Sequence, residues 1–159
     1  MEATFPTYQA TDSPAFPLTT RQTSGLIADI PTQIILTEYL DKRFLIITQV
    51  GKIGSLHLTS IDTPTIPQLT PSPLPPPLPH TTTRTLLGPR DDTLSHVYAS
   101  HIAAKTAAAH PGDDRPMLLG LALDRRVASI DEEGDEKGVQ LRKVVWEGVL
   151  KLLEKIGLW

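Results

Sequence analysis

The chain has 159 residues, with 15 Lys and Arg against 18 Asp and Glu, and its formal net charge at pH 7 is −3. This balance argues against a nucleic-acid partner, which would need a basic stripe or a strong positive excess. The chain has no cysteine, which excludes a disulfide framework and a thiolate zinc site. A signal peptide and an apolar run of the ~20 residues that span a bilayer are both missing. We therefore expect no membrane partner, and a location in the cytoplasm with the nucleus as a second compartment.

The first part of the chain predicts a leader followed by closely spaced strands. Residues 1–17 are polar and contain three prolines, so we expect a flexible leader before a single domain at 18–159. Strand-like runs follow at about 19–29, 33–40, 43–50 and 53–60. Their connections are short, whereas a parallel pair would need a long crossover. The pattern therefore predicts antiparallel neighbours.

Gly51-Lys52 could belong either to a phosphate-binding loop or to a hairpin turn. A Walker loop needs a Gly five residues before the Gly of this pair and a Ser or Thr directly after the Lys. Ile46 and Ile53 occupy these two positions. Glycine first in the pair suits a type II′ turn. We therefore interpret Gly51 and Lys52 as the hairpin turn between the third and fourth strands.

A proline-rich loop follows at 62–80 and holds eight of the fifteen prolines. Proline cannot donate to a strand ladder and favours polyproline II. We interpret the loop as a tolerated insertion between strands. A ligand for a partner's groove is the alternative, because PxxP-like spacing recurs in it.

The second half predicts two more strands and two helices. A fifth strand is expected at 82–88, a helix at 91–110, a central strand at 115–124, and a helix at about 138–156. Asp92 or Thr93 is expected to cap the first helix. Its predicted apolar stripe is Leu94, Val97, Tyr98 and Ile102. The acidic loop at 129–137 suits a solvated surface better than a metal site. The fold class is therefore α+β, with a six-stranded antiparallel sheet and two helices packed on one face.

Side-chain alternation across the two predicted hairpins separates two faces of the sheet. The turns would place Tyr39 opposite Phe44, Thr37 opposite Ile46, Val50 opposite Ile53 and Thr48 opposite Ser55. The predicted helix-covered face is Ile34, Leu36, Leu45, Ile47, Leu56 and Leu58. The other face would carry Gln33, Ile35, Thr37, Tyr39, Phe44, Ile46, Thr48, Val50, Ile53, Ser55, His57 and Thr59. No third helix is left to cover it, so we predict a sheet-on-sheet dimer interface. The alternative is that the leader or the proline-rich loop covers this face.

We find no pattern that indicates catalysis, a cofactor or a metal site. The five histidines lack ligand-like spacing, and His96 and His101 would lie about 140° apart on a helix. Motifs of hydrolases, zinc proteases and dinucleotide-binding folds are absent. We therefore expect a protein that is not an enzyme.

Several stretches resemble the proteasome assembly chaperone 3 family. They are IPTQIILT at 30–37, ITQVGKIGSL at 47–56, TLLG at 85–88, LSHVYA at 94–99, MLLGLALD at 117–124 and the terminal helix before Trp159. The resemblance implies a eukaryotic, non-catalytic chaperone of 20S proteasome assembly. It also implies a heterodimer with the fourth assembly chaperone, packed sheet against sheet, that holds α-ring subunits, the α5-type first. The residues themselves leave open a homodimer of the isolated chain, and a small dimeric trafficking or signalling adaptor as the alternative function.

Overall fold

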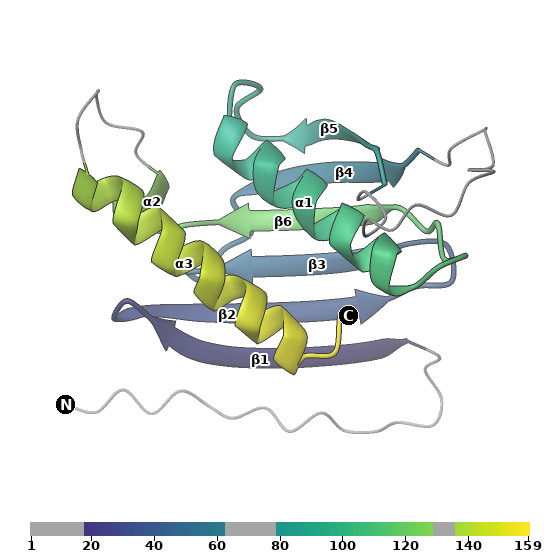
Figure 1. The fold of residues 1–159 in the computed structure, drawn as a ribbon, viewed down its shortest axis with the longest axis horizontal. Coiled ribbons are helices and arrows are strands. Elements are labelled where there is room, and N and C mark those ends of the chain that lie inside the picture. The colour runs from purple at the N-terminus through teal and green to yellow at the C-terminus, as the bar shows by residue number, and fades with distance from the viewer. Residues whose placement is uncertain (1–17, 63–78, 129–135) are drawn as a thin grey trace, which may run out of the picture.

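The computed structural model describes residues 18–62, 79–128 and 136–159, so the predicted leader and most of both predicted loops lie outside it. Six strands form one sheet, and the two long helices lie across the same face of it (Figure 1). The elements in chain order are β1 (Thr19–Ile27), β2 (Ile30–Glu38), β3 (Arg43–Thr48), β4 (Ser55–Ile61), β5 (Thr81–Leu87), α1 (Thr93–Ala109), β6 (Met117–Ala122), α2 (Arg125–Ala128) and α3 (Glu136–Lys155). This confirms the α+β class and the number of strands.

Local capping explains where the long helices begin and end. The Asp92 side chain accepts a hydrogen bond of 3.0 Å from the Ser95 amide, which confirms Asp92 as the N-cap of α1. After α3, Gly157 adopts a φ of +74°. The Leu158 amide then donates to the Leu153 carbonyl, the pattern of a Schellman cap.

Three details of the helices differ from the sequence-based expectation. Helix α3 begins at Glu136, so the last two residues of the predicted acidic loop belong to its first turn, where a carboxylate interacts favourably with the helix dipole. The short helix α2 was not predicted. In α1 the side chain of Val97 is 53% exposed and does not join the core, whereas Tyr98 and Ile102 are buried as expected.

The strand order β1-β2-β3-β6-β4-β5 places β6 between β3 and β4. β6 pairs in parallel with β3 and antiparallel with β4, so the prediction of a wholly antiparallel sheet was wrong for one pair. The predicted hairpin between β3 and β4 does not form. Strand β6, with the sequence MLLGLA, is apolar on both sides, and a central position removes more apolar surface from water than an edge position.

The predicted residue pairs change accordingly. Thr48 lies opposite Ala122, and Ser55 lies opposite Leu121, so the predicted pairs Thr48–Ser55 and Val50–Ile53 are wrong. Between β2 and β3 the register differs from the prediction by two residues, because the chain turns through four residues after Glu38 instead of two. Phe44 therefore lies opposite Thr37, not Tyr39, and Ile46 lies opposite Ile35. A shift of two residues keeps each side chain on its predicted face.

The core lies between the sheet and the two long helices. Ile34, Leu36, Leu45 and Ile47 are fully buried there, as predicted. They pack with Leu119 and Leu121 of β6, Tyr98 and Ile102 of α1, and Val145, Val149 and Leu153 of α3.

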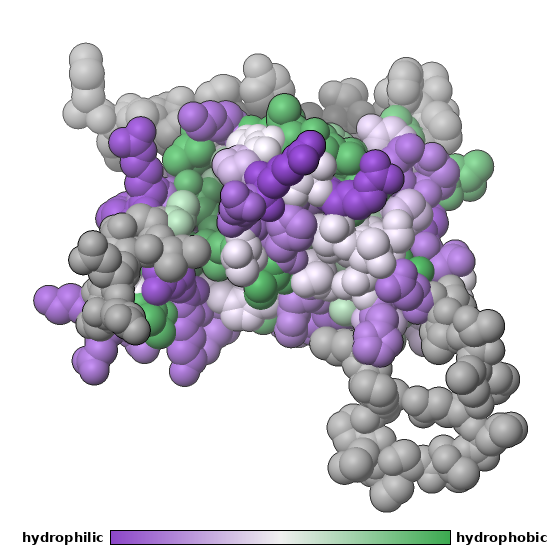
Figure 2. Space-filling model, turned by 90° about the horizontal axis from the view of Figure 1, so that it is seen from above, coloured by the Kyte–Doolittle hydropathy of each residue, from purple (hydrophilic) through white to green (hydrophobic). Residues whose placement is uncertain are grey.

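The edge of the molecule around β5 and α1, seen from above in Figure 2, mixes hydrophilic, intermediate and hydrophobic side chains.

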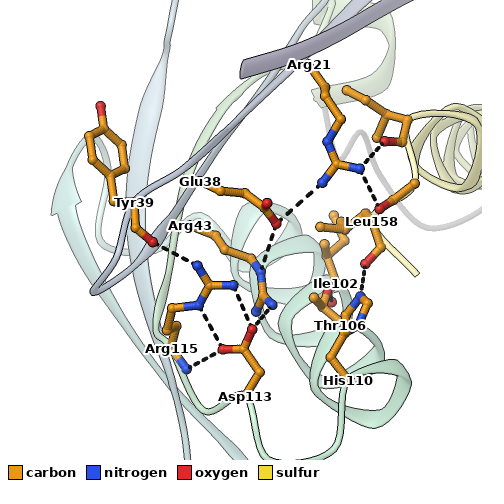
Figure 3. A network of polar contacts seen from close by, with 12 residues as sticks. Arg21, Glu38, Tyr39, Arg43, Ile102, Thr106, His110, Asp113, Arg115 and Leu158 are labelled. Atoms are coloured by element: carbon orange, nitrogen blue, oxygen red, sulfur yellow. Dashed lines mark hydrogen bonds and ion pairs between the residues drawn. The ribbon is translucent and has the colours of Figure 1, made fainter. Parts of the chain in front are cut away.

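A network of charged side chains closes one end of the core (Figure 3). Arg43, whose side chain is buried, forms ion pairs with Glu38 and Asp113. The side chain of Arg115 also binds Asp113, at 2.7 Å, and donates to the Tyr39 carbonyl at 2.8 Å. Hydrogen bonds from Arg115, together with the charge of Arg43, hold the pKa of the Asp113 carboxyl well below its ordinary value. The network fixes the loop before β6 to the loop between β2 and β3.

Candidate functional site

The sheet surface opposite α1 and α3, which we call the open face, is the candidate site. No described helix lies on this side of the sheet (Figure 1). Register and burial pattern assign to the open face Thr20, Gln22, Ser24 and Leu26 of β1, Pro31, Gln33, Ile35 and Thr37 of β2, Phe44, Ile46 and Thr48 of β3, Leu118, Gly120 and Ala122 of β6, Leu56, Leu58 and Ser60 of β4, and Thr82, Arg84 and Leu87 of β5.

An apolar stripe crosses the middle of the open face. Its side chains are half-buried and come from four adjacent strands: Ile35, Phe44, Ile46, Leu118, Leu56 and Leu58. Gly120 lies between them, and a Cβ built there would meet Cγ2 of Ile53 at 2.9 Å. Ile53, from the loop after β3, therefore packs against the bare backbone of β6. Around this stripe, the outer strand β1 contributes mainly hydroxyl and amide groups, and the outer strand β5 contributes Thr82, Arg84 and Leu87.

A cavity of about 640 Å³ opens at one end of the open face, beside the turn between β1 and β2. Leu26, Pro31 and Val50 supply its apolar lining, and Gln33 and Thr48 supply polar groups. None of its lining residues is charged. Such a cavity suits an uncharged side chain of a partner, because buried anchors in pockets contribute much of the energy of protein interfaces.

Most of the predicted interface residues lie on or beside the open face. Ile35, Thr37, Phe44, Ile46 and Thr48 are on it, and Val50 and Ile53, each more than two-fifths exposed, border it in the loop after β3. Tyr39 is half-buried in the loop between β2 and β3.

The predicted face was wrong for β4. Ser55, His57 and Thr59 are buried on the helix-covered side, whereas Leu56 and Leu58, predicted as core, lie on the open face. The prediction extends the alternation through a hairpin between β3 and β4, and this hairpin does not form. The connection from β3 to β4 passes over the end of β6, which lies between them. The side chains of β4 therefore alternate in the opposite phase to the prediction. The sequence-based set also lacked Leu118 and Gly120, whose position depends on the insertion of β6.

Polar side chains of β4 and β5 meet the first half of α1. The Thr85 hydroxyl contacts Nδ1 of His57 at 3.3 Å and Nε2 of His96 at 2.8 Å. The two imidazole rings lie 5.0 Å apart, edge to face. Burial lowers the pKa of His57 from its ordinary value, His96 lowers it further, and Asp92 partly opposes these effects.

Acidification is expected to weaken this contact between α1 and the sheet. Because folding lowers the pKa of His57, the folded chain favours neutral His57. The resulting stabilisation is complete above the pKa of a solvated histidine, about 6.5, and is lost as the pH falls through that value toward the lower pKa of the folded state. In urea unfolding at pH 7.5, the free energy of unfolding of the wild type should be about 1 to 3 kcal/mol larger than that of His57→Gln. The difference should narrow at pH 5.5. If the difference between wild type and His57→Gln is the same at both pH values, this prediction is wrong. His101→Gln, at an exposed position, is the control, and its difference from wild type should not change with pH in this way.

The Gly51-Lys52 segment has the geometry of a turn, although not of a hairpin. Gly51 has a φ of +70°, and Lys52 is exposed. Within the residues that the structure describes, no group of three or more His, Cys, Asp or Glu is placed to hold a metal ion. The helices in the same part of the chain are all too short or too polar to cross a membrane.

The fold and the open face define an α+β protein whose single sheet is covered by helices on one side and is apolar along the middle of the other. A sequence model of the proteasome assembly chaperone 3 family matches residues 45–137. The chain is 31% identical over 105 residues to proteasome assembly chaperone 3 of Bos taurus, covering 66% of this chain and 77% of that protein. It is 27% identical over 103 residues to the Homo sapiens protein of the same name, covering 65% and 75%. The chain belongs to the proteasome assembly chaperone 3 family.

A solved structure shares the fold. A chain from the crystal structure of a novel chaperone complex for yeast 20S proteasome assembly superposes with a TM-score of 0.57 at 14% identity, covering 87% of this chain and 98% of that chain. The family match confirms the resemblance seen in the sequence. The structural match confirms the fold alone.

Proposed function

We propose that the chain is a non-catalytic chaperone of 20S proteasome assembly that pairs through its open face with a subunit of the fourth assembly chaperone type. The pair would hold α-ring subunits, the α5-type first, while the α-ring forms. Membership of the proteasome assembly chaperone 3 family supports the role in proteasome assembly. The open face is the observation that carries the pairing.

The composition of the open face fits a protein interface. Its apolar stripe includes Phe44, Ile46 and Leu118, and the polar groups around it are mostly hydroxyls and amides. Interfaces combine an apolar centre with a polar rim. Two such faces can pack about 10 Å apart in the manner of a sandwich.

The proposed mechanism is stoichiometric. A chaperone that binds one arrangement of ring subunits more tightly than the others raises the population of that arrangement, by an amount set by the difference in affinity. No bond needs to be made or broken. Later subunits would displace the chaperone by occupying the same surface of the growing ring.

The test is reconstitution from purified components. The chain, the subunit of the fourth assembly chaperone type and an α5-type subunit are mixed and separated by size exclusion with light scattering. We expect one complex containing one copy of each, and no complex when a β-type proteasome subunit replaces the α5-type subunit. A pair that forms but retains no α subunit would contradict the α-ring proposal and would favour an adaptor function.

A further inference from the structure

Arg84 differs from every other residue of the open face. The other strand residues of this face are apolar, or carry hydroxyl or amide groups, and Arg84 is its single ionised side chain among the described strands. Arg84 is exposed, and its side chain makes no hydrogen bond or ion pair with the described residues. The other arginines near the sheet, such as Arg21 and Arg43, lie on the helix-covered side and are paired there.

The position of Arg84 brings it close to the apolar stripe. It lies opposite Leu58 of β4, and the same row continues through Leu118 to Phe44. A partner sheet that covers this row therefore approaches the guanidinium group. A guanidinium group taken out of water without an acceptor opposes binding, whereas one that meets a carboxylate forms a strong, directional pair.

In a second copy of the chain, the described strands of the open face offer no such carboxylate. The open face has no Asp or Glu within its described strands. Asp62, one residue beyond the end of β4, accepts hydrogen bonds of 3.1 and 3.2 Å from the Thr82 hydroxyl. Consider two copies that pack open face to open face around a two-fold axis centred on the stripe. If this axis runs perpendicular to the strands, Arg84 would lie opposite Leu87 of the second copy. If the axis runs parallel to the strands, Arg84 would lie opposite β1 of the second copy, near Thr20.

We infer that the open face selects a different chain, one that carries a carboxylate opposite Arg84 on an otherwise uncharged apolar sheet, and that Arg84 disfavours self-pairing. This inference rests on the pairing proposed above and adds the chemistry of the partner. A single charge within an uncharged face gives specificity, because it favours one partner and penalises the other.

The neutral variant Arg84→Gln tests the inference, because its effect should have opposite signs for the two kinds of pair. Self-association of the full chain is measured by sedimentation, and binding to the subunit of the fourth assembly chaperone type is measured by titration. We expect Arg84→Gln to strengthen self-association by about tenfold or more and to weaken the heterologous pair by about tenfold or more. Arg84→Lys, which keeps the charge, should stay close to wild type. Arg90→Gln, at an exposed position in the turn before α1, makes the same change in net charge away from the face and should alter neither affinity.

Any other result for Arg84→Gln overturns the inference. A change of the same sign in both assays would mean that the charge acts generally, and no change in either would mean that Arg84 stays in solvent at the rim. The pairing itself is tested separately by Ile46→Asp. If that variant dissociates the pair while Arg84→Gln has no effect, only the role of Arg84 is wrong. If Ile46→Asp leaves the pair intact, the proposed interface is wrong as well.

Discussion

Replacing Leu45 with Asp should unfold the chain, whereas replacing its neighbour Ile46 with Asp should leave a folded chain that no longer pairs. Leu45 is fully buried between the sheet and the helices. An unpaired carboxylate there costs more than about 5 kcal/mol, comparable to the whole stability of a domain. Ile46 points to the open face and is only half-buried. Its replacement should cost the free chain about 1 kcal/mol, but a sheet interface about 3 to 5 kcal/mol.

Circular dichroism and sedimentation separate these two outcomes. Ile46→Asp should keep the wild-type spectrum, and in a mixture with the subunit of the fourth assembly chaperone type it should still sediment as a single chain. Phe44→Asp should behave in the same way. Leu45→Asp should give the circular dichroism spectrum of an unfolded chain. If the Ile46 and Phe44 variants both remain paired, the open face is not the interface, and the proposed pairing loses its structural basis.

The second large effect is expected at Gly54, which precedes β4. Its φ is +68°, and a Cβ built there would lie 2.3 Å from the Leu121 carbonyl oxygen and 2.8 Å from Cβ of Ala122. These atoms belong to β6, whose backbone cannot move away without breaking its ladders to β3 and β4. We therefore expect Gly54→Ala to lower the free energy of unfolding by about 3 to 5 kcal/mol, combining backbone strain and steric conflict.

Gly51 is a matched control for Gly54. Its φ of +70° is nearly the same, but nothing lies within 4 Å of a Cβ built there. Gly51→Ala should therefore show the backbone cost alone, about 1 to 2 kcal/mol. Lys52→Ala, at an exposed position, should change stability by less than about 0.5 kcal/mol. Equal losses for the two glycine variants in urea unfolding would show that contact with β6 does not explain the requirement for glycine.

The local sequence was sufficient to predict those features of the fold that depend only on residues close together in the chain. The periods of apolar residues predicted six strands and two long helices near their observed positions, because each period follows from the geometry of one element. The N-cap Asp92 could be identified as one of two candidates because capping depends on a few adjacent residues. The faces of β2 and β3 were also correct, since an error of two residues in register does not change the side to which a residue points.

The candidate site depended on information that the local sequence does not carry. Nothing near Gly51 shows that β6, more than sixty residues later in the chain, lies between β3 and β4. That insertion is favoured by the burial of a strand that is apolar on both sides, which is a property of the whole sheet. Because β6 lies between β3 and β4, His57 is buried beneath α1, and Leu58 and Leu118 are on the open face. For the same reason Arg84 lies at the end of the row that contains Leu58 and Leu118. The sequence by itself determined the six strands, the two long helices, the N-cap of α1 and the family. The tertiary structure alone decided which side chains of β4, β5 and β6 meet on one face, because strand neighbours are chosen by contacts between distant segments.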